Sequence, residues 1–477
     1  MAFKDLREYI EKLEASGDLV KVKKEVDWNL EIGAIIRRCN ETQGPATLFE
    51  NIKGYPSNYR VMGGPIATFR RAAITMGLDP STHYTKLLDT FIERSKRPIK
   101  PLIVSTGPCK ENIIVGDKVD LLSFPTPLIH FGDGGRYLGT WNTGANKDPD
   151  SDWVNWGMYR LMVHDRYSTG INVSSHQHGG IILQKYEKNN LPMPYVAFIG
   201  SDPVVDFLSA IPIPYGINEA DIVGAIRGEP LELVRAETCD LLVPASAEII
   251  LEGVILPGER KGEGPHGEYA GYQQSGIVDR PVFHVKAITH RNNPILTVSN
   301  IGTPIDDSHI CTGSIGTAAN IKMELLRTGL PIKGIYIPPQ SCHHLAIVST
   351  ETPYPHIATR IACLIFAASG GAAIARVIVV NDDIDPTNMD EVIHAFATKC
   401  HPVRGEIVIP HALSSPLTGF LDPQERTKGF GAKAIYDCTW PLDWPADKIP
   451  PRSSFRDIYP ADIQDKVLSN WAGYGFK

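Results

Sequence analysis

Apolar residues recur every three or four positions near the start of the chain. This spacing predicts a helix over Asp5 to Ala15, which Gly17 ends. The stretch from Leu19 to Val26 then predicts a strand. We therefore expect residues 1–100 to form an N-terminal α/β segment that packs on the domain that follows it.

From about Leu102 to Pro294 the pattern changes to many short apolar runs separated by glycine and proline. Such runs include Tyr159 to Val163, Ile181 to Leu183 and Val282 to Ile288. Short strands at this spacing predict a β-rich middle domain, to which we assign residues 101–305.

Helix and strand patterns alternate again in the last part of the chain. Ile315 to Leu325 predicts a helix that links the β-rich region to the rest, and we assign residues 306–330 to this linker. Ile357 to Ala368 predicts a second helix, and Ala375 to Val380 predicts a buried parallel strand of β-branched residues. The pattern indicates an α+β fold whose last domain, residues 331–477, is an α/β layer.

Composition is that of a large folded protein. The 477 residues are 43% hydrophobic and 21% charged, enough for two or three domains. Lys and Arg number 47 against 54 Asp and Glu, and the net charge of -7 offers no electrostatic reason to bind nucleic acid or an anionic membrane. This balance favours a small-molecule partner.

The chain shows no sign of export or of membrane insertion. Its N-terminal residues carry charges throughout, unlike a secretory signal. The longest stretch free of Asp, Glu, Lys, Arg and His, Ile361 to Ala375, has 15 residues, fewer than the roughly 20 needed to cross a bilayer, and predicts a buried helix. Eight scattered cysteines without a C-x-x-C pair suit a reducing compartment, so we expect a cytoplasmic protein.

The segment Glu263-Gly-Pro-His-Gly-Glu268-Tyr carries two carboxylates, and its Gly and Pro residues prevent a helix. A rigid loop can aim both acids at one point. Paired carboxylates suit general acid-base chemistry, because each raises the proton affinity of the other. A solvated turn is the alternative interpretation of this segment.

A second candidate is the aromatic-flanked run from Asn155 to Arg160. On a strand, Met158 and Arg160 would share one face. A guanidinium there needs a carboxylate, either from a substrate or from Glu263 and Glu268, and would hold it in a planar fork. A purely structural ion pair remains the alternative.

A third candidate set combines an amide oxygen of Asn155, a ring nitrogen of His178 and the carboxylate of Glu219. These ligand types suit manganese or magnesium better than zinc. A histidine that merely satisfies the core is the alternative. Nucleotide loops are absent from the sequence, because Gly132-Asp-Gly-Gly135 lacks the last glycine of G-x-G-x-x-G and no P-loop motif occurs.

Taken in order, the motifs of the chain resemble those of the UbiD family of reversible decarboxylases, which use prenylated flavin mononucleotide (FMN). The resemblance covers nearly the whole chain and is closest to the ferulic/cinnamic acid type. It rests on residues 155–160, 177–178, 211–214, 263–268, 298–300, 382–385 and 471–475. The resemblance implies a split-barrel flavin-binding domain, and a C-terminal domain for oligomerisation that also carries a substrate lid.

The resemblance also implies site residues. Glu268 would be the proton donor, and Arg160 and Glu263 would complete an ionic network that orients the acid. Asn155, His178 and Glu219 would hold a manganese ion that binds the cofactor phosphate. A potassium site would use the backbone oxygens of Ser209 and Ile211, together with Trp156 and Glu219, and the flavin would be lined by Thr140, Met158, Gln177 and Pro212.

Departures from the family pattern bear on the substrate and on cofactor contacts. Residues 368–371 lack the Lys that is frequent near the cofactor, and Lys399 stands where an Arg is common. In the region that resembles the substrate lid, Ser415 precedes Pro416 and Leu417 where a bulkier aromatic residue is common, and Thr312 stands where an aliphatic residue is common. We therefore expect a larger or more polar aromatic acid than cinnamate, such as a hydroxylated or fused-ring acid.

The same family implies a homo-oligomer, either a dimer or a hexamer, and a separate flavin prenyltransferase that supplies the cofactor. Two other functions stay open at this point. One is a metal-dependent hydrolase in which Asn155, His178 and Glu219 activate water and Glu263 or Glu268 is the base. The other is a catalytically silent relative, although three ionisable groups in one region argue against it.

Overall fold

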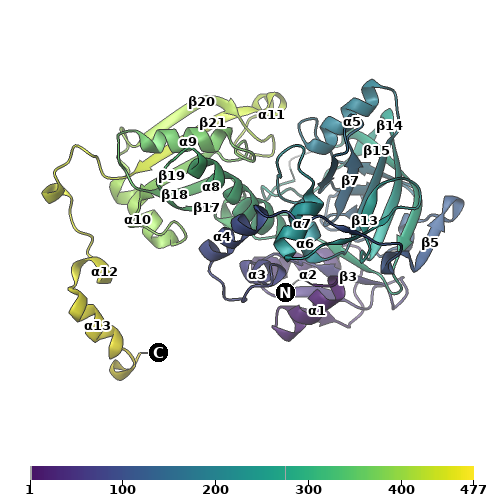
Figure 1. Cartoon of the computed structure of the whole chain (residues 1–477), viewed down its shortest axis with the longest axis horizontal. Helices are drawn as coiled ribbons and strands as arrows, with labels where there is room; N and C mark the ends of the chain where they lie inside the picture. Colours follow the sequence, from purple (N-terminus) through teal and green to yellow (C-terminus); the bar gives the residue numbers. More distant parts are fainter. Residues whose placement is uncertain (1–2, 274–275, 477) are drawn as a thin grey trace.

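The computed structural model describes residues 3–273 and 276–476. Two lobes, one rich in long strands and one a smaller α/β layer, lie side by side and are joined through α8 (Ala318–Arg327) (Figure 1). The N-terminal segment packs at the base of the larger lobe, and a C-terminal arm extends away from the smaller one (Figure 1). The α+β class predicted from the sequence is confirmed.

The N-terminal segment forms a four-stranded sheet with strand order β1-β2-β3-β16. Its fourth strand, β16, comes from the end of the β-rich region and pairs in parallel with β3. The predicted first helix is present with Asp5 as its cap, and the predicted strand ends early at Val22. The elements are α1 (Leu6–Ala15), β1 (Leu19–Val22), α2 (Glu31–Glu41), β2 (Ala46–Phe49), β3 (Arg60–Gly63), α3 (Phe69–Thr75), α4 (Tyr84–Ser95) and β16 (Ile295–Val298).

The larger lobe is a curled sheet of nine described strands, ordered β6-β9-β10-β15-β14-β11-β7-β8, with β5 paired to β15. A long hairpin of β14 (Ile249–Glu263) and β15 (Val278–His290) runs through it. The other strands are β5 (Asn112–Val115), β6 (Tyr137–Gly139), β7 (Thr143–Lys147), β8 (Val154–Gly157), β9 (Leu161–Val163), β10 (Ser168–Ile171) and β11 (Met193–Ile199). The loop that begins at Glu263 is therefore the connection between the two longest strands.

Helices close one side of this sheet, and a small three-stranded sheet lies beside it. They are α5 (His178–Lys188), α6 (Pro203–Ser209) and α7 (Glu219–Arg227), with β4 (Leu102–Ile103), β12 (Glu232–Arg235) and β13 (Leu242–Pro244). The predicted strand Ile181 to Leu183 is wrong, because these residues lie inside α5. A three-residue apolar run has the same pattern on a helix and on a strand, so periodicity could not decide between them.

The smaller lobe is a five-stranded sheet of order β17-β18-β19-β21-β20. The predicted helix and strand after the linker are present as α9 and β19. The elements are β17 (Ile332–Tyr336), β18 (Leu345–Thr350), α9 (Ile357–Ala367), β19 (Arg376–Asn381), α10 (Met389–Lys399), β20 (Glu406–Leu413), α11 (Pro423–Lys428) and β21 (Phe430–Cys438). Because α9 ends at Ala367, only the first half of the uncharged stretch Ile361 to Ala375 is helical.

Beyond the smaller lobe the chain continues as an arm with α12 (Phe455–Ile458) and α13 (Ala461–Ser469) (Figure 1). Residues 450–476 are almost all exposed, including large apolar side chains. Among the described residues, no helix combines the length and the apolar character that crossing a bilayer requires.

The linker between the lobes begins with a π-helical segment, η4 (His309–Thr317), followed directly by α8. His309 lies at its start and is fully buried. Its Nδ1 is 2.9 Å from Asp306 Oδ1, and its Nε2 is 2.6 Å from the carbonyl oxygen of Tyr269. Both of these partners are acceptors, which favours a proton on each ring nitrogen, while the backbone amide of Asp306 also lies 3.2 Å from Nδ1. Burial alone would lower the pKa of His309, but the Asp306 carboxylate outweighs it and raises this pKa to about 10.

The first prediction concerns this buried pair. A histidine whose pKa is raised by folding stabilises the protein fully below its unfolded pKa of about 6.5, and the gain is lost as the pH rises towards about 10. His309→Gln should therefore lower the free energy of unfolding by about 3 kcal/mol at pH 6 and by much less at pH 9.5. Denaturant unfolding at the two pH values measures this difference.

His290 offers a matched control, because it is also buried, its Nδ1 lies 2.8 Å from the carbonyl oxygen of Arg291, and it has no carboxylate partner among the described residues. His290→Gln should show no comparable change with pH. A penalty for His309→Gln that is the same at both pH values would contradict the charged pair.

Candidate active site

Three of the predicted site residues meet at one point of the larger lobe. Arg160 Nε and Nη2 each lie 2.8 Å from a carboxylate oxygen of Glu263, and Nη1 donates to Glu268. Glu263 and Glu268 are both buried. One guanidinium thus holds two carboxylates, the first through a bidentate fork.

The local structure around Arg160 differs from the expectation. Met158 and Arg160 do not share the face of a strand, because β8 ends at Gly157 and β9 begins at Leu161. Both residues lie in the short extended connection between these strands. This connection frees the Arg160 side chain from the pleat and lets it reach the loop that follows β14.

Charge and hydrogen bonding favour the ionised form of Glu263. Burial would raise its pKa, but the fork and charge of Arg160 and the hydroxyl of Tyr137 lower it below the ordinary value. Tyr137 donates to Glu263 Oε1 over 2.9 Å. Sequence reasoning missed Tyr137, whose only signal was a large aromatic residue two positions after the Gly132–Gly135 turn.

The loop of the two carboxylates packs backbone to backbone on the loop before β6. The amide of Gly134 donates to the carbonyl of Pro265 over 2.8 Å. A Cβ atom added at Gly134 would lie 1.9 Å from the carbonyl oxygen of Gly264. Only glycine allows this approach, so the segment that failed as a nucleotide loop instead supports the carboxylates.

The predicted ligand set Asn155, His178 and Glu219 gathers around β8. Asn155 lies on β8, while His178 and Glu219 are the first residues of α5 and α7. Glu219 Oε2 accepts the amide of Trp156 over 2.9 Å. Tyr159 links Asn155 to the start of α5. Its hydroxyl accepts from Asn155 Nδ2 at 3.3 Å and from the amide of Gly179, the residue after His178, at 2.9 Å.

The electrostatics of this set suit a cation. Glu219 is 2% exposed and forms no ion pair within the described residues, and burial raises its pKa to about 8. Partial burial lowers the pKa of His178, so its ring is neutral near pH 7 and has a free lone pair. A buried carboxylate, a neutral imidazole and an amide oxygen form a donor set for a hard divalent ion. The two helix N-termini beside it favour an anion such as phosphate.

Of the residues predicted to surround the flavin and potassium, some are linked by hydrogen bonds near α6 and α8, whereas Thr140 and Gln177 lie elsewhere. The amide of Met158 donates to the carbonyl of Ser209 over 3.0 Å, and Asn320 Nδ2 on α8 donates to the carbonyl of Pro212 over 2.7 Å. Ile211, which lies between Ser209 and Pro212 in the sequence, is buried. Thr140 instead accepts the amide of Ser299 over 3.1 Å at the end of β6, and Gln177 is the exposed N-cap residue of α5.

Two of the three predicted substrate residues have their hydroxyl groups engaged. Thr312 Oγ1 donates to the carbonyl of Ala210 over 2.8 Å. Ser415 Oγ lies 2.8 Å from the hydroxyl of Tyr269, the residue directly after Glu268, and Leu417 is partly buried two positions further along. The segment around Ser415 in the smaller lobe thus contacts the carboxylate loop of the larger one.

The segment 368–371, which lacks the expected lysine, and Lys399, which stands in place of an arginine, line two different cavities. Ser369 lines a cavity of about 380 Å³ together with Pro212 and Asn320. Lys399 lines another cavity, of about 1000 Å³, where its Nζ is 2.5 Å from Asn381 Oδ1. The turn after Ser369 lacks a lysine of its own, but Lys433 from β21 donates to three of its carbonyls, at 2.6–3.1 Å.

Comparison with protein-family models gives three consecutive matches. They are the N-terminal, Rift-related and C-terminal domains of 3-octaprenyl-4-hydroxybenzoate carboxy-lyase, also called UbiD, over residues 10–91, 102–304 and 312–438. Among curated proteins, pyrrole-2-carboxylic acid decarboxylase of Pseudomonas aeruginosa is 35% identical, over 99% of this chain and 98% of the relative. Ferulic acid decarboxylase 1 of Saccharomyces cerevisiae is 34% identical over the same shares.

Solved structures give the same result. The closed form of vanillic acid decarboxylase from Sedimentibacter hydroxybenzoicus has a TM-score of 0.87 at 30% identity and covers 99% of both chains. An evolved dimeric form of the UbiD-class enzyme HmfF from Pelotomaculum thermopropionicum, in complex with prenylated FMN, has a TM-score of 0.80 at 31% identity. That match covers 94% of this chain and 97% of the other.

The second prediction tests the support beneath the carboxylates. Gly134→Ala should destabilise the protein by roughly 1–3 kcal/mol, because its Cβ would force the carbonyl of Gly264 away. Gly276→Ala is the matched control, since a Cβ there meets no atom within 4 Å. Thermal unfolding measures both variants, and equal melting temperatures would contradict the close approach of the two loops.

Proposed function

The chain belongs to the UbiD family of carboxy-lyases, and we propose that it is a reversible, non-oxidative decarboxylase that uses prenylated FMN. Its substrate is an aromatic or α,β-unsaturated carboxylic acid. The observation that carries this proposal is the buried Arg160, held between Glu263 and Glu268 in a chain of this family. The names of the relatives, which specify pyrrole-2-carboxylic, ferulic and vanillic acids, support the substrate class.

The residues present fit the cofactor that this chemistry requires. A carbanion left on an sp² carbon needs an electron acceptor that no side chain supplies, and the bound flavin supplies it. Asn155, His178 and Glu219 would hold a manganese ion at the cofactor phosphate, and the unpaired buried carboxylate of Glu219 supports this assignment. The N-termini of α5 and α7 add favourable dipoles for the phosphate.

The neighbouring backbone suits a second cation. A potassium ion would use the carbonyl oxygens of Ser209 and Ile211, near Trp156 and Glu219. Two cations would offset the phosphate charge in this buried region. Thr140, Met158, Gln177 and Pro212 would line the flavin.

The chain's own residues then act on the acid and on one proton. Arg160 orients the substrate carboxylate while its fork keeps Glu263 ionised. The bond between the carboxylate and the ring or alkene carbon breaks, and CO2 leaves. Glu268 delivers a proton to that carbon, and the loop around it excludes water so that the proton transfer stays specific.

The lid residues support a polar acid. The hydroxyl groups of Ser415 and Tyr269 lie 2.8 Å apart, and Tyr269 directly follows Glu268 in the chain. A hydroxylated or fused-ring acid could exchange hydrogen bonds with this pair. The hydroxyl of Thr312 already donates to Ala210, so Thr312 contributes width rather than a free donor.

The C-terminal arm supports a homo-oligomer, which we propose is a dimer or a hexamer built from dimers. Phe455 is 41%, Tyr459 53% and Leu468 61% exposed, although side chains of this kind are usually covered. A separate flavin prenyltransferase would supply the cofactor. A metal-dependent hydrolase is the weaker alternative, because both candidate bases, Glu263 and Glu268, are bound to Arg160.

The third prediction tests the proton donor. After coexpression with a flavin prenyltransferase, Glu268→Gln should bind flavin and metal as the wild type does but lose turnover by about 10³-fold or more. Product formation from a panel of aromatic and enoic acids, measured as CO2 release, gives the readout. Glu259→Gln is the matched control on β14, since Glu259 is partly exposed and pairs with His284, and it should keep activity. An active Glu268→Gln enzyme would remove this assignment.

The fourth prediction tests the cation site. Glu219→Gln and His178→Ala should each lose most of the bound manganese and flavin, measured by metal analysis, cofactor mass and visible absorbance. Asp221→Asn removes a charge from the same first turn of α7 and should retain both. Wild-type protein that binds manganese but no flavin would favour the hydrolase.

A further inference from the structure

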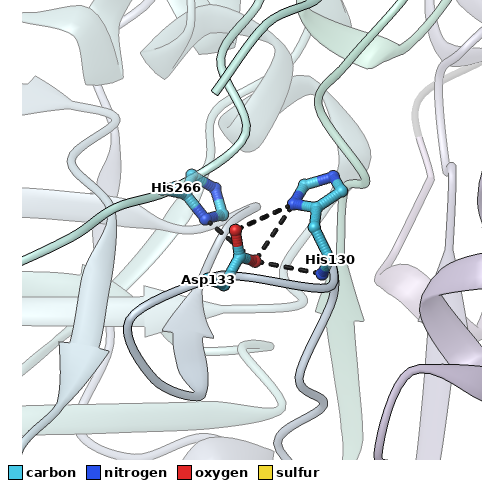
Figure 2. Close-up of side chains that lie close together, drawn as sticks. All are labelled: His130, Asp133 and His266. Carbon is cyan, nitrogen blue, oxygen red and sulfur yellow. Dashed lines mark hydrogen bonds and ion pairs between the residues drawn. The ribbon is translucent and has the colours of Figure 1, made fainter. Parts of the chain in front are cut away.

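A second ionic cluster lies beside the carboxylate loop and has no role in the function proposed above. It consists of His130 and Asp133 from the loop before β6, and of His266, midway between Glu263 and Glu268 (Figure 2). The Asp133 carboxylate lies between the two imidazoles. Its Oδ2 is 3.0 Å from His130 Nδ1 and 3.3 Å from His266 Nδ1.

His130 is doubly protonated in this arrangement. Its Nδ1 faces the Asp133 carboxylate, and its Nε2 lies 2.8 Å from Asn300 Oδ1. The amide nitrogen of Asn300 donates to the carbonyl of Gly33, which fixes the amide oxygen towards His130. Both ring nitrogens therefore donate, and His130 has no lone pair for a metal ion. The three residues form a charge cluster rather than a metal site.

Asp133 clamps the carboxylate loop. Its Oδ1 accepts the amide of Gly267 over 3.2 Å, directly between His266 and Glu268. A Cβ at Gly267 would lie 2.6 Å from the His130 ring, so the loop backbone packs against this imidazole. Together with the bond from Gly134 to Pro265, these contacts fix both ends of the segment between the two carboxylates.

His266 couples the cluster to Glu263. It is 1% exposed, and its ring lies 4.1 Å from that of Tyr137, whose hydroxyl donates to Glu263. Neither ring nitrogen makes a hydrogen bond within the described part of the chain, so Asp133 is its nearest ionic partner. A proton on His266 would attract both carboxylates, and it contributes to the lowered pKa values of Asp133 and Glu263.

The balance of charges around His266 bears on whether its imidazole is protonated. The connected groups comprise three carboxylates and two fixed cations: Asp133, Glu263, Glu268, Arg160 and His130. One negative charge is left over, and a proton on either His266 or Glu268 neutralises it. Because buried charge is costly, the two residues compete for that proton.

The other titratable groups around the cluster do not fully neutralise this excess negative charge. The charged or titratable side chains facing Glu263 or His266 are Tyr137, Arg160, His164, Glu268, Arg280, His130 and Asp133. Burial lowers the pKa of His164, which is therefore neutral near pH 7. Arg280 forms no ion pair within the described residues, and its Nε is buried, so its charge acts on Glu263 and Glu268 only from beyond ion-pair distance and offsets the excess in part.

We propose that Asp133 and His266 form a positioning dyad that fixes the carboxylate loop and controls when Glu268 holds its proton. Only one part of this proposal rests on the proposed function, namely that Glu268 acts as the proton donor. Its charge and geometry can be tested without any turnover. Neither residue touches the reacting atoms, so both act through Glu263 and Glu268.

The first test follows His266 directly in protein without cofactor. Ring carbon signals of ¹³C-labelled histidine are recorded against pH, and the signal missing in His266→Phe assigns the residue. Asp133→Asn should lower the midpoint of His266 by about one pH unit, whereas Asp133→Glu, which keeps the charge, should restore most of it. His290→Phe, a change at a buried histidine outside the cluster, should leave the midpoint unchanged. An unchanged midpoint in Asp133→Asn would overturn the dyad.

The second test uses the cofactor-loaded enzyme. Removing the imidazole withdraws a positive charge from Glu263 and Glu268, so Glu268 should keep its proton to higher pH. The alkaline limb of the pH profile of kcat in His266→Phe should then move up by about one pH unit. A fall in kcat by the same factor at every pH would mean a structural role only and would overturn the proposal.

The two tests fail separately from the proposed function. If no acid is decarboxylated, the function fails while the histidine titration still decides the dyad. Should Asp133→Asn not fold, the pH profile of His266→Phe decides it, because Phe keeps the ring contact with Tyr137.

Discussion

The single positive charge of Arg160 is the constraint on which the site depends. Two buried carboxylates converge on it, and a guanidinium can bind one bidentately while it donates to another, which an ammonium cannot do with fixed geometry. Glu263 takes the fork and stays ionised. Glu268 receives the one remaining guanidinium nitrogen, Nη1. A group in this position is suited to move a proton, whereas its neighbour is suited to stay fixed.

The run from Asn155 to Arg160 joins this proton site to the candidate cation site. At one end, the backbone of Trp156 donates to Glu219 and Asn155 contacts Tyr159. At the other end, Arg160 reaches across to the loop after β14. The extended connection between β8 and β9 allows this, because its side chains need not alternate as they do in a pleated strand. A shift of this connection would therefore move both sites together.

The sequence allowed the fold class, the two lobes' main elements and the meeting of Arg160 with Glu263 and Glu268 to be predicted, since motif and resemblance agreed there. It could not reveal that Ile181 to Leu183 is helical, because a short apolar run has no distinctive period. It also could not reveal Asp133 and His130. Their importance arises from backbone contact between loops more than one hundred positions apart, at Gly134 and Pro265. Such proximity is a property of the closed sheet and has no local signature.

The far end of the carboxylate loop is tied to the smaller lobe. The carbonyl of Tyr269 accepts from His309 in the linker, its hydroxyl contacts Ser415, and its ring stacks on His343 at 4.8 Å. Glu268 precedes Tyr269 directly, so a displacement of the smaller lobe would pull on the residue next to the proposed proton donor. Asp133 holds the same loop from the opposite side through Gly267. Glu268 thus lies between a contact within the larger lobe, at Gly267, and contacts with the linker and the smaller lobe, at Tyr269. Its position therefore depends on how the two lobes are placed relative to each other.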